Sequence, residues 1–362
     1  MKKIKVNILT PPMTSQNVRG FLTPIIINKR NLLNLGIDFK FFNKNHQNLV
    51  DCDILFLNAR FYGKRWVNEP VKIIEEIEKY KSSGIKIFYC DNYDSTALIR
   101  TEVLNAVDVY FKNMILKDKS QYNQSFYGGR IHTHFINNNY KIEDSDLLYS
   151  KPINKLEELN KIKVSWNYGL AHYGLIGSRV ANLYNKIPLS ILLKFPYKFL
   201  SPNRKRYNDV FCRISSSYSR ETVAYHRKMI NKEINKKYTI GRVNPLQYFN
   251  EMRNSKLIIS PFGWGEFSLR DFETFLYGGI LLKPDMSHLD TYPNFYIPNK
   301  TFIEFKWDLS NLHQIIENTL DNYKEKIEIA EYSQELYKYH LTSNLGNEEF
   351  CLRLSKILKE NL

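Results

Sequence analysis

The sequence predicts two doubly wound α/β domains, each a parallel sheet covered by helices on both faces. The chain has 362 residues, which is longer than the ~100–200 residues of an ordinary single domain. Short apolar runs such as 54–57 and 85–89 alternate with stretches of helical periodicity, as strands buried on both faces do. The alternation restarts near Asp209, which is typical of two such units in tandem.

The first half is expected to alternate strands and helices from its first residues. Gly36 and Gly84 follow two of the helical stretches, at the position where glycine commonly ends a helix. The expected strands are Lys3–Leu9, Asp38–Phe42, Asp53–Asn58, Ile85–Cys90 and Asp108–Phe111, and the expected helices are Ile25–Leu35, Val71–Ser82 and Thr96–Leu104.

The second half repeats the pattern, and one of its helices has a clear start signal, Asn244 as N-cap followed by Pro245. The tail from Asn311 to Leu362 is expected to be helical. The expected strands are Asp209–Ser215, Tyr238–Gly241, Lys256–Ser260 and Ile280–Lys283, and the expected helices are Ser219–Asn235, Pro245–Asn254 and Ser268–Tyr277.

These elements predict an N-terminal domain at residues 1–165, a linking segment at 166–208 and a C-terminal domain at 209–345. A last helix at 346–362 is expected to cross back to the first domain. Open α/β sheets bind ligands at the carboxyl ends of their strands. The two Rossmann-like domains would therefore face each other across a cleft that holds the site.

Net charge and cysteine content limit the kinds of function and cellular location that the sequence predicts. The formal net charge is +15, which favours acidic partners such as nucleic acid, anionic lipid or phosphorylated small molecules. The abundance of residues with A/T-rich codons offers a competing, genomic explanation. The four cysteines stand far apart, and no apolar run approaches the ~18 residues of a membrane span, so we expect a reduced, cytoplasmic protein.

The segment 255–284 holds the most informative pattern: a buried strand, a glycine-bearing loop and then a helix. In the loop, Gly263 and Gly265 flank Trp264, and both glycines allow a ligand to approach the backbone closely. A glycine loop between a strand and a helix predicts a ligand site at the start of that helix.

The helix itself predicts a donor site. Ser268 is expected to cap it, with Asp271 completing a variant of the capping box. Arg270 and Glu273 share one helix face, where the cation and the free amides suit a diphosphate and the carboxylate suits a sugar diol. The alternative is an i,i+3 ion pair on a solvated face.

This segment resembles the donor-binding motif of GT-B-fold glycosyltransferases, particularly exostosin-like and bacterial surface-polysaccharide enzymes. The resemblance is strongest over residues 244–298. It implies that Glu273 binds the ribose of a nucleotide sugar. Glu266 is similar to the upstream glutamate of a related two-glutamate motif, although six residues intervene here where that motif has seven.

The same resemblance places further donor contacts in loops that follow strands. It implies that the nucleobase rests against Arg242 and Val243. The pattern predicts that Ser215 and Ser216 open a helix, and we expect them to contact phosphate or else to be an ordinary serine cap. In the first domain, the loop at 15–20 would bring Arg19 and Gly20 opposite the donor phosphates; it matches neither a dinucleotide fingerprint nor a P-loop.

Glycosyl transfer with inversion needs a base for the acceptor hydroxyl. Asp91 and Asp94 directly follow a predicted buried strand, so either could be that base, and Asp94 could instead cap the next helix. His132 and His134 alternate in a segment predicted to be extended, without a third ligand nearby. We therefore expect transfer without a metal or other cofactor.

The linking segment carries apolar and aromatic residues at 187–200 followed by a basic cluster at 203–206. It predicts either a packed linker or a surface that lies on anionic lipid at the inner face of the cytoplasmic membrane. The leading hypothesis is a glycosyltransferase that moves a sugar from a nucleotide sugar to a glycan or lipid-linked glycan of the bacterial surface. The alternatives are a nucleotide-sugar epimerase and a nucleic-acid-binding protein; no nucleic-acid-binding signature supports the last.

Overall fold

The first half forms a six-stranded sheet in the order β2-β1-β3-β4-β5-β7, with every pair parallel. The computed structural model describes residues 3–171, 177–194 and 198–362. In this doubly wound order the strand sequence reverses between β1 and β3, where such sheets bind ligands. The strands are β1 (Ile4–Leu9), β2 (Ile37–Phe42), β3 (Ile54–Asn58), β4 (Lys86–Asp91), β5 (Val109–Lys112) and β7 (Ile162–Val164).

The helices of the first half flank this sheet, apart from α7, which packs on α10 (Glu221–Ile234) of the second half, and three of them differ from the predictions. They are α1 (Gln16–Ile27), α2 (Lys29–Asn34), α3 (Ala59–Tyr62), α4 (Arg65–Asn68), α5 (Pro70–Lys81), α6 (Thr101–Leu104), α7 (Ile131–Tyr140) and α8 (Leu156–Lys161), with 3-10 turns η1 (Gln47–Val50) and η2 (Lys119–Asn123). Helix α1 begins early because the Ser15 side chain accepts a hydrogen bond from the amide of Val18. Helix α6 is one turn, and α7 replaces the extended segment expected around His132 and His134.

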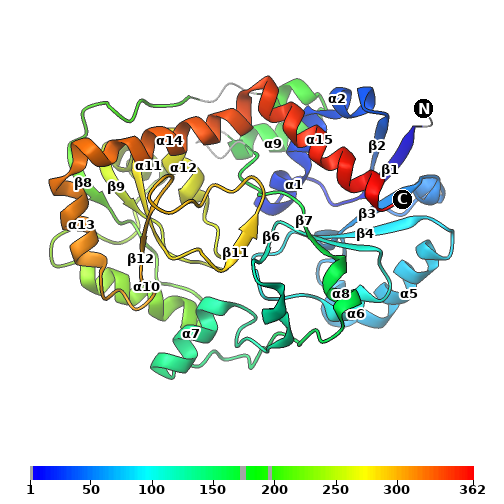
Figure 1. Cartoon of the computed structure of the whole chain (residues 1–362), viewed down its shortest axis with the longest axis horizontal. Helices are drawn as coiled ribbons and strands as arrows, with labels where there is room; N and C mark the ends of the chain where they lie inside the picture. The colour runs from blue at the N-terminus through cyan, green and yellow to red at the C-terminus, as the bar shows by residue number, and fades with distance from the viewer. Residues whose placement is uncertain (1–2, 172–176, 195–197) are drawn as a thin grey trace.

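The second half forms a four-stranded parallel sheet in the order β12-β10-β9-β8, on the left in Figure 1. Its strands are β8 (Asn208–Phe211), β9 (Ser255–Ile259), β10 (Ile280–Pro284) and β12 (Ile303–Phe305). Its helices are α10 (Glu221–Ile234), α11 (Pro245–Arg253), α12 (Leu269–Tyr277), α13 (Leu312–Asp321) and α14 (Tyr323–Thr342). The side chains of β9 alternate between two apolar clusters, because Leu257 and Ile259 face α10 and α13, whereas Ile258 faces α12.

Two strand predictions in this half are wrong for local reasons. The amides of Lys237 and Tyr238 bond back to the carbonyl of Ile234, so the chain after α10 turns and forms no strand at 238–241. Strand β8 ends at Phe211, because the carbonyls of Arg213 and Ser215 accept hydrogen bonds from arginine side chains and not from a neighbouring strand.

The two halves are joined by more than one segment. Strand β6 (Met114–Leu116) pairs antiparallel with β11 (Leu289–Thr291) across the halves. Trp166 stacks on Phe21 with ring centroids 4.9 Å apart. A Cβ on Gly169 would lie 2.4 Å from the Phe272 ring, so only glycine lets the backbone pass this close to α12. One apolar core therefore runs through both sheets.

The last helix, α15 (Asn344–Glu360), lies along the first domain (Figure 1). It packs on α2, and Arg353 donates hydrogen bonds to the carbonyls of Val164 and Ser165 (2.6 Å each). The linking segment includes α9 (Gly177–Lys186) and the 3-10 turn η3 (Ser190–Lys194); its residues 172–176 and 195–197 lie outside the described residues. Two parallel sheets with helices on both faces confirm the predicted α/β fold class. No described helix combines the length and apolar composition needed to span a bilayer.

Candidate active site

The loops that follow β4 and β9 meet where the carboxyl ends of the two sheets face each other. A Cβ on Gly265 would lie 2.9 Å from Cβ of Asp94, so the glycine allows the two backbones to touch. The amide of Thr96 points at Glu266 Oε1 at 3.4 Å, and Arg130 Nε donates to the carbonyl of Trp264. The predicted glycine loop is thus held against the first domain.

The start of α12 is fixed by the capping box that the sequence predicted. The Ser268 side chain caps the helix, and its amide donates to Asp271 Oδ2 (3.1 Å). Asp271 is fully buried and also contacts Lys283 Nζ (3.0 Å) and the hydroxyl of Tyr296 (2.8 Å). A buried carboxylate with this many partners holds the helix start rigidly in front of the cleft.

Arg270 lies inside the domain, which corrects the prediction that it lines the cleft edge. Its guanidinium donates to the carbonyls of Ile259 (3.0 Å) and Arg213 (2.7 Å), and to the hydroxyl of Tyr248 (3.3 Å). The backbone beyond β8 and at the end of β9 leaves carbonyls without strand partners, and Arg270 satisfies them. Its role is therefore to position α12 against the sheet.

Glu273, the predicted ribose ligand, lies one turn along the same helix and is only 7% exposed. Its Oε2 accepts a hydrogen bond from the hydroxyl of Tyr248 (2.9 Å). Burial raises the pKa of Glu273 to about 7, against the opposing effects of Tyr248 and Arg270. The carboxyl group therefore titrates near neutral pH, and its contact with a ribose stays a prediction.

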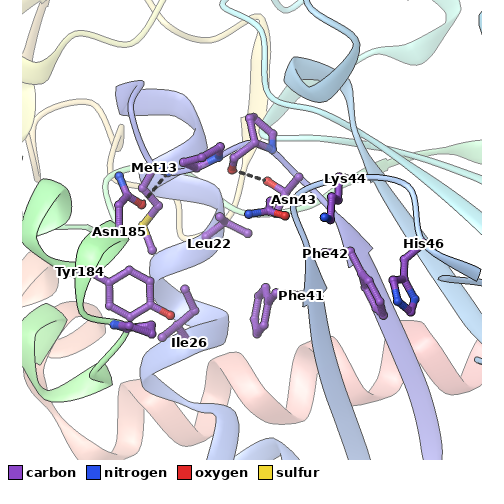
Figure 2. A pocket seen from close by; sticks show the side chains of 14 residues that line it. Met13, Leu22, Ile26, Phe41, Phe42, Asn43, Lys44, His46, Tyr184 and Asn185 are labelled. Carbon is purple, nitrogen blue, oxygen red and sulfur yellow. Dashed lines mark hydrogen bonds between the residues drawn. The ribbon is translucent and has the colours of Figure 1, made fainter. Parts of the chain in front are cut away.

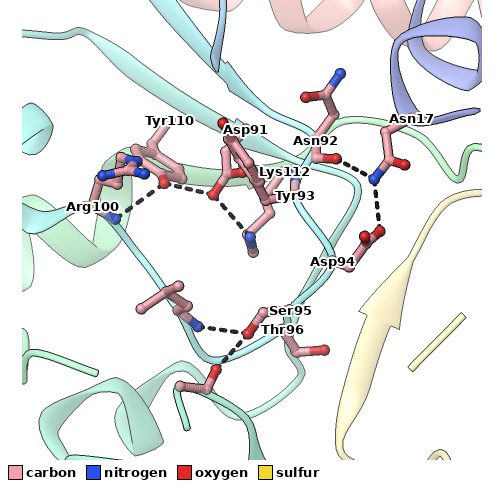
Figure 3. A network of polar contacts seen from close by, with 12 residues as sticks. Asn17, Asp91, Asn92, Tyr93, Asp94, Ser95, Thr96, Arg100, Tyr110 and Lys112 are labelled. Atoms are coloured by element: carbon pink, nitrogen blue, oxygen red, sulfur yellow. Dashed lines mark hydrogen bonds and ion pairs between the residues drawn. The ribbon is translucent and has the colours of Figure 1, made fainter. Parts of the chain in front are cut away.

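Asp91 and Asp94 occupy different environments, as Figure 3 shows. Asp91 accepts from Lys112 Nζ (2.9 Å) and the hydroxyl of Tyr110 (2.7 Å), and both members of the ion pair are buried. Burial alone favours the neutral acid, but Lys112 and Tyr110 hold the pKa of Asp91 below its ordinary value. With its oxygens occupied, Asp91 braces the ends of β4 and β5 and is poorly placed to take a proton from a substrate.

Asp94 lies at the cleft and does not cap a helix, because the next helix begins at Thr101 with Arg100 as its N-cap residue. Asn17 Nδ2 donates to Asp94 Oδ1 (2.6 Å), and Arg60 Nη2 lies 3.7 Å from Oδ2. The side chain is 30% exposed. Of the two predicted bases, Asp94 is the one that solvent and a substrate can reach.

A cavity of about 340 Å³ opens beside Asp94, and we call it the interdomain cavity. First-domain loops form most of it, and Trp264 of the second domain closes one side. Arg130 was not singled out from the sequence as a site residue. The two glycines that precede it, Gly128 and Gly129, both have φ of +66° and form a turn that directs the Arg130 side chain into the cavity, so this glycine pair was the available sequence signal. The cavity is lined by Arg60, Asp91, Tyr93, Asp94, Ser95, Leu98, Arg100, Lys112, Arg130 and Trp264.

Glu266 is buried beside two histidines. His288 Nε2 lies 3.8 Å from Glu266 Oε1, and the His132 ring lies tilted against that of Phe262, with centroids 4.7 Å apart. Burial opposes ionisation of Glu266, but its contacts with His288 and His132 lower its pKa; burial lowers the pKa of His132 to about 3. Within the described residues, the ring nitrogens of both histidines lack hydrogen-bond partners.

The two histidines at 132 and 134 lie on α7, so the i,i+2 spacing turns them away from each other. Over the described ranges, no group of three His, Cys, Asp or Glu side chains could hold a metal ion. Transfer without a metal stays a prediction.

The serines predicted to contact the donor phosphate lie in the loop after β8. Ser215 and Ser216 are half-buried in a loop that does not open a helix, since α10 begins at Glu221. Arg227, which the sequence reasoning did not single out, donates to the carbonyls of Ser215 (2.6 Å) and Phe262 (2.6 Å), and so links the loops after β8 and β9.

Two other predicted contact regions lie in contrasting surroundings. Arg242 is exposed and Val243 half-buried in an open loop before α11, and their contact with a nucleobase stays a prediction. Arg19 and Gly20 are buried inside α1, and a Cβ on Gly20 would lie 2.1 Å from Cβ of Tyr168. Gly20 therefore serves close packing of α1 on the linking segment, which corrects its assignment to a phosphate-facing loop.

No protein-family model matches this sequence, and no curated protein does. Among solved structures, the chain is similar to Anabaena Alr3699/HepE in complex with UDP-glucose, at 11% identity and a TM-score of 0.45, covering 98% of this chain and 100% of that one. It is also similar to a glycosyltransferase from Rickettsia africae ESF-5, at 13% identity and a TM-score of 0.47, covering 100% of both chains. A putative UDP-N-acetylglucosamine 2-epimerase from Listeria monocytogenes is similar at 10% identity and a TM-score of 0.40, covering 99% of this chain and 96% of that one. With TM-scores below 0.5, these similarities leave the function to be argued from the site itself.

Proposed function

We propose that the protein is a glycosyltransferase that moves a sugar from a nucleotide sugar to a hydroxyl group of an acceptor. The observation that carries the proposal is the meeting of the glycine loop before α12 with the loop of Asp94. It brings the segment that resembles a donor-binding motif against an accessible carboxylate of the other domain. A transferase needs donor and base on opposite sides of one cleft, and the placement of this segment against Asp94 supports the proposal.

In the proposed reaction the acceptor hydroxyl oxygen attacks the anomeric carbon of the donor sugar. Asp94 takes the hydroxyl proton, the bond from the anomeric carbon to the diphosphate oxygen breaks, and its electron pair leaves with the diphosphate. This assignment applies to inverting transfer. Glu273 would accept hydrogen bonds from the ribose of the donor.

Arg227 is the cation we propose to stabilise the leaving diphosphate without a metal. Its Nε and Nη1 are held by the carbonyls of Ser215 and Phe262, which fixes the guanidinium between two loops at the sheet edge. No described carboxylate forms an ion pair with it. A positioned cation costs little reorganisation when negative charge develops beside it.

The buried pair of Glu266 and His288 favours a second candidate, a nucleotide-sugar epimerase. Such an enzyme needs acid and base groups shielded from water, and no acceptor. Incubation of a nucleotide sugar in D₂O without acceptor distinguishes the two. An epimerase incorporates deuterium into the sugar, whereas a transferase leaves the donor sugar unlabelled.

We further propose a lipid-linked glycan of the bacterial surface as acceptor and the inner face of the cytoplasmic membrane as the working place. Ile187, Leu189 and Ile191 expose apolar side chains in and before η3. Beside them, an apolar hollow of about 320 Å³ is lined by residues such as Ile26, Phe41 and Tyr184, with Lys44 and His46 also at its wall (Figure 2). Apolar side chains next to cations suit the surface of an anionic bilayer.

The test of the donor proposal is a melting-temperature screen with UDP-, GDP-, CMP- and ADP-sugars on the full chain. A ligand that binds only the native state raises stability, by about 2.7 kcal/mol at a concentration 100 times its Kd. We expect one nucleotide class to raise the melting temperature, and Glu273→Gln to remove most of that rise. Glu317→Gln, a change at an exposed carboxylate of α13, serves as the control. If no nucleotide sugar shifts melting, the proposed function is wrong.

A further inference from the structure

The interdomain cavity carries more positive than negative side chains. Four cations, Arg60, Arg100, Lys112 and Arg130, line it against two carboxylates, Asp91 and Asp94. Lys112 and Asp91 neutralise each other at 2.9 Å. Arg60 and Asp94 approach only to 3.7 Å. Two arginines therefore remain without a carboxylate on the cavity wall.

Arg130 is the most buried of these arginines, at 8% exposed. Its Nε and Nη1 donate to the carbonyls of Trp264 and Gly128, the latter at 2.7 Å. Its Nη2 has no hydrogen-bond partner among the described residues, and no described carboxylate forms an ion pair with it. A guanidinium held by neutral carbonyls keeps its full charge available to a ligand.

The guanidinium groups of the other two arginines lie over aromatic rings. Arg60 lies 3.9 Å from the ring centre of Tyr93, and Arg100 lies 4.4 Å from that of Trp66. Stacking fixes the plane of a guanidinium and leaves its edge free for paired hydrogen bonds. Arg100 forms only a long, partly exposed ion pair with Glu102, at 3.8 Å, which is beyond hydrogen-bonding distance. Planar, pre-oriented donors of this kind match a carboxylate or a phosphate group.

The rest of the wall suits a sugar. Trp264 is 42% exposed at the cavity, and Tyr93 offers a second aromatic surface. Aromatic faces pack well against the apolar face of a ring, and a cavity of about 340 Å³ is at the small end of ligand sites. Asp94, the proposed base, lies on the same wall.

We infer that the interdomain cavity binds an acidic sugar, one that carries a carboxylate or a phosphate group, as the acceptor residue of the glycan. The inference rests on the proposed function only in naming this ligand the acceptor. The anionic group would contact Arg100 and Arg130, and the hydroxyl to be glycosylated would face Asp94.

We propose to test this inference by ligand-observed NMR. The full chain is titrated with glucose, glucuronic acid and glucose 6-phosphate in 150 mM NaCl. We expect at least one of the acidic sugars to bind about tenfold more tightly than glucose, as one charge-assisted pair would give. Comparing the two acids shows whether carboxylate or phosphate is preferred. Arg100→Gln should bring the preferred acid within about threefold of glucose, whereas Arg30→Gln, on the exposed side of α2, should leave the preference intact.

Arg130→Gln is the second variant in case Arg100→Gln melts early, since Arg130 is the other proposed contact of the anionic group. Equal affinity for all three sugars overturns the inference. A preference that survives both substitutions also overturns it, because the anions would then respond only to the overall positive charge. Failure of the donor proposal has a different readout. Nucleotide sugars would not shift melting, while the Arg100-dependent preference would persist.

Discussion

Single residues decide which of the two aspartates after β4 could act in catalysis. Asp91→Asn removes the charge that balances Lys112, and a buried ammonium without its partner costs about 3–5 kcal/mol. We expect this variant to lose that much in free energy of unfolding, measured by urea denaturation. Asp94→Asn should change stability by less than about 1 kcal/mol, because its side chain is partly exposed, and should lower turnover at least 100-fold.

A second substitution separates stability from chemistry at Asp91. Asp91→Asn combined with Lys112→Met removes both charges of the buried pair, so stability should recover in part. If the double variant is stable but has lost turnover to the same extent as Asp94→Asn, Asp91 has a chemical role after all. Full turnover in Asp94→Asn would instead remove Asp94 as the base.

Glu273 makes stability depend on pH near neutrality. Its folded pKa of about 7 lies above the ordinary carboxyl value of about 4.3, so the folded state holds a proton that the unfolded chain releases. The resulting stability is fully present below about pH 4 and is lost as pH rises through about 7. We expect the free energy of unfolding to fall between pH 5 and pH 8 by on the order of 3 kcal/mol more in the natural chain than in Glu273→Gln. Parallel stability profiles would show that Glu273 is already ionised at pH 5.

At the scale of elements, close approach of two loops depends on Gly265. A Cβ there would meet Cβ of Asp94 at 2.9 Å and its Cα at 3.1 Å. Gly265→Ala should push the loops after β4 and β9 apart by some tenths of an ångström and reduce transfer at least tenfold. Gly263→Ala is the matched control two residues earlier, because its Cβ would meet only the side-chain ends of Tyr218, at 3.3 Å, and Arg227, at 3.8 Å, and no backbone of the other loop. Equal activity in the two variants would show that the contact is irrelevant to the reaction.

The elements that the sequence predicted well are those with local signals. The capping residues Ser268 and Asp271 predict the start of α12, and short apolar runs predict the buried strands. The element predictions that were wrong have tertiary causes. Arginine side chains satisfy the backbone beyond β8, so it needs no strand partner. Residues at 92–100 form loop and not helix, because Ser95 and Thr96 bond to Gly129 and Glu266 far along the chain.

At the scale of the whole molecule, the candidate site arises from contacts that no local pattern contains. The face-to-face placement of two sheets could be expected from their topology, and with it the region of the cleft. Asp91 is buried against Lys112, and Arg270 turns inward, because of partners that lie 11 to 57 residues away in sequence, which no local pattern reveals. The cavity between the sheets likewise combines residues from 60 to 264.

The positive charge and the exposed apolar side chains before the second domain predict reversible binding to anionic vesicles. Arg206 is excluded from this surface, because it is buried and donates to the carbonyls of Ser255 and Tyr277. The two most exposed apolar side chains of this surface are Leu189, at 56%, and Ile191, at 69%. Each side chain that enters the bilayer interface contributes about 1 kcal/mol, or roughly fivefold in partition.

We therefore expect Leu189→Ser with Ile191→Ser to lower sedimentation with phosphatidylglycerol-containing vesicles at least tenfold, at an unchanged melting temperature. Leu147→Ser, at a leucine that is 75% exposed in the loop after α7, should leave binding unaltered. Binding by the natural chain should weaken as salt rises and be nearly absent with uncharged phosphatidylcholine vesicles, because long-range attraction to anionic lipid is screened. An equal loss in the Leu147 control, or none in the double variant, would mean that membrane binding, if any, uses another face of the protein.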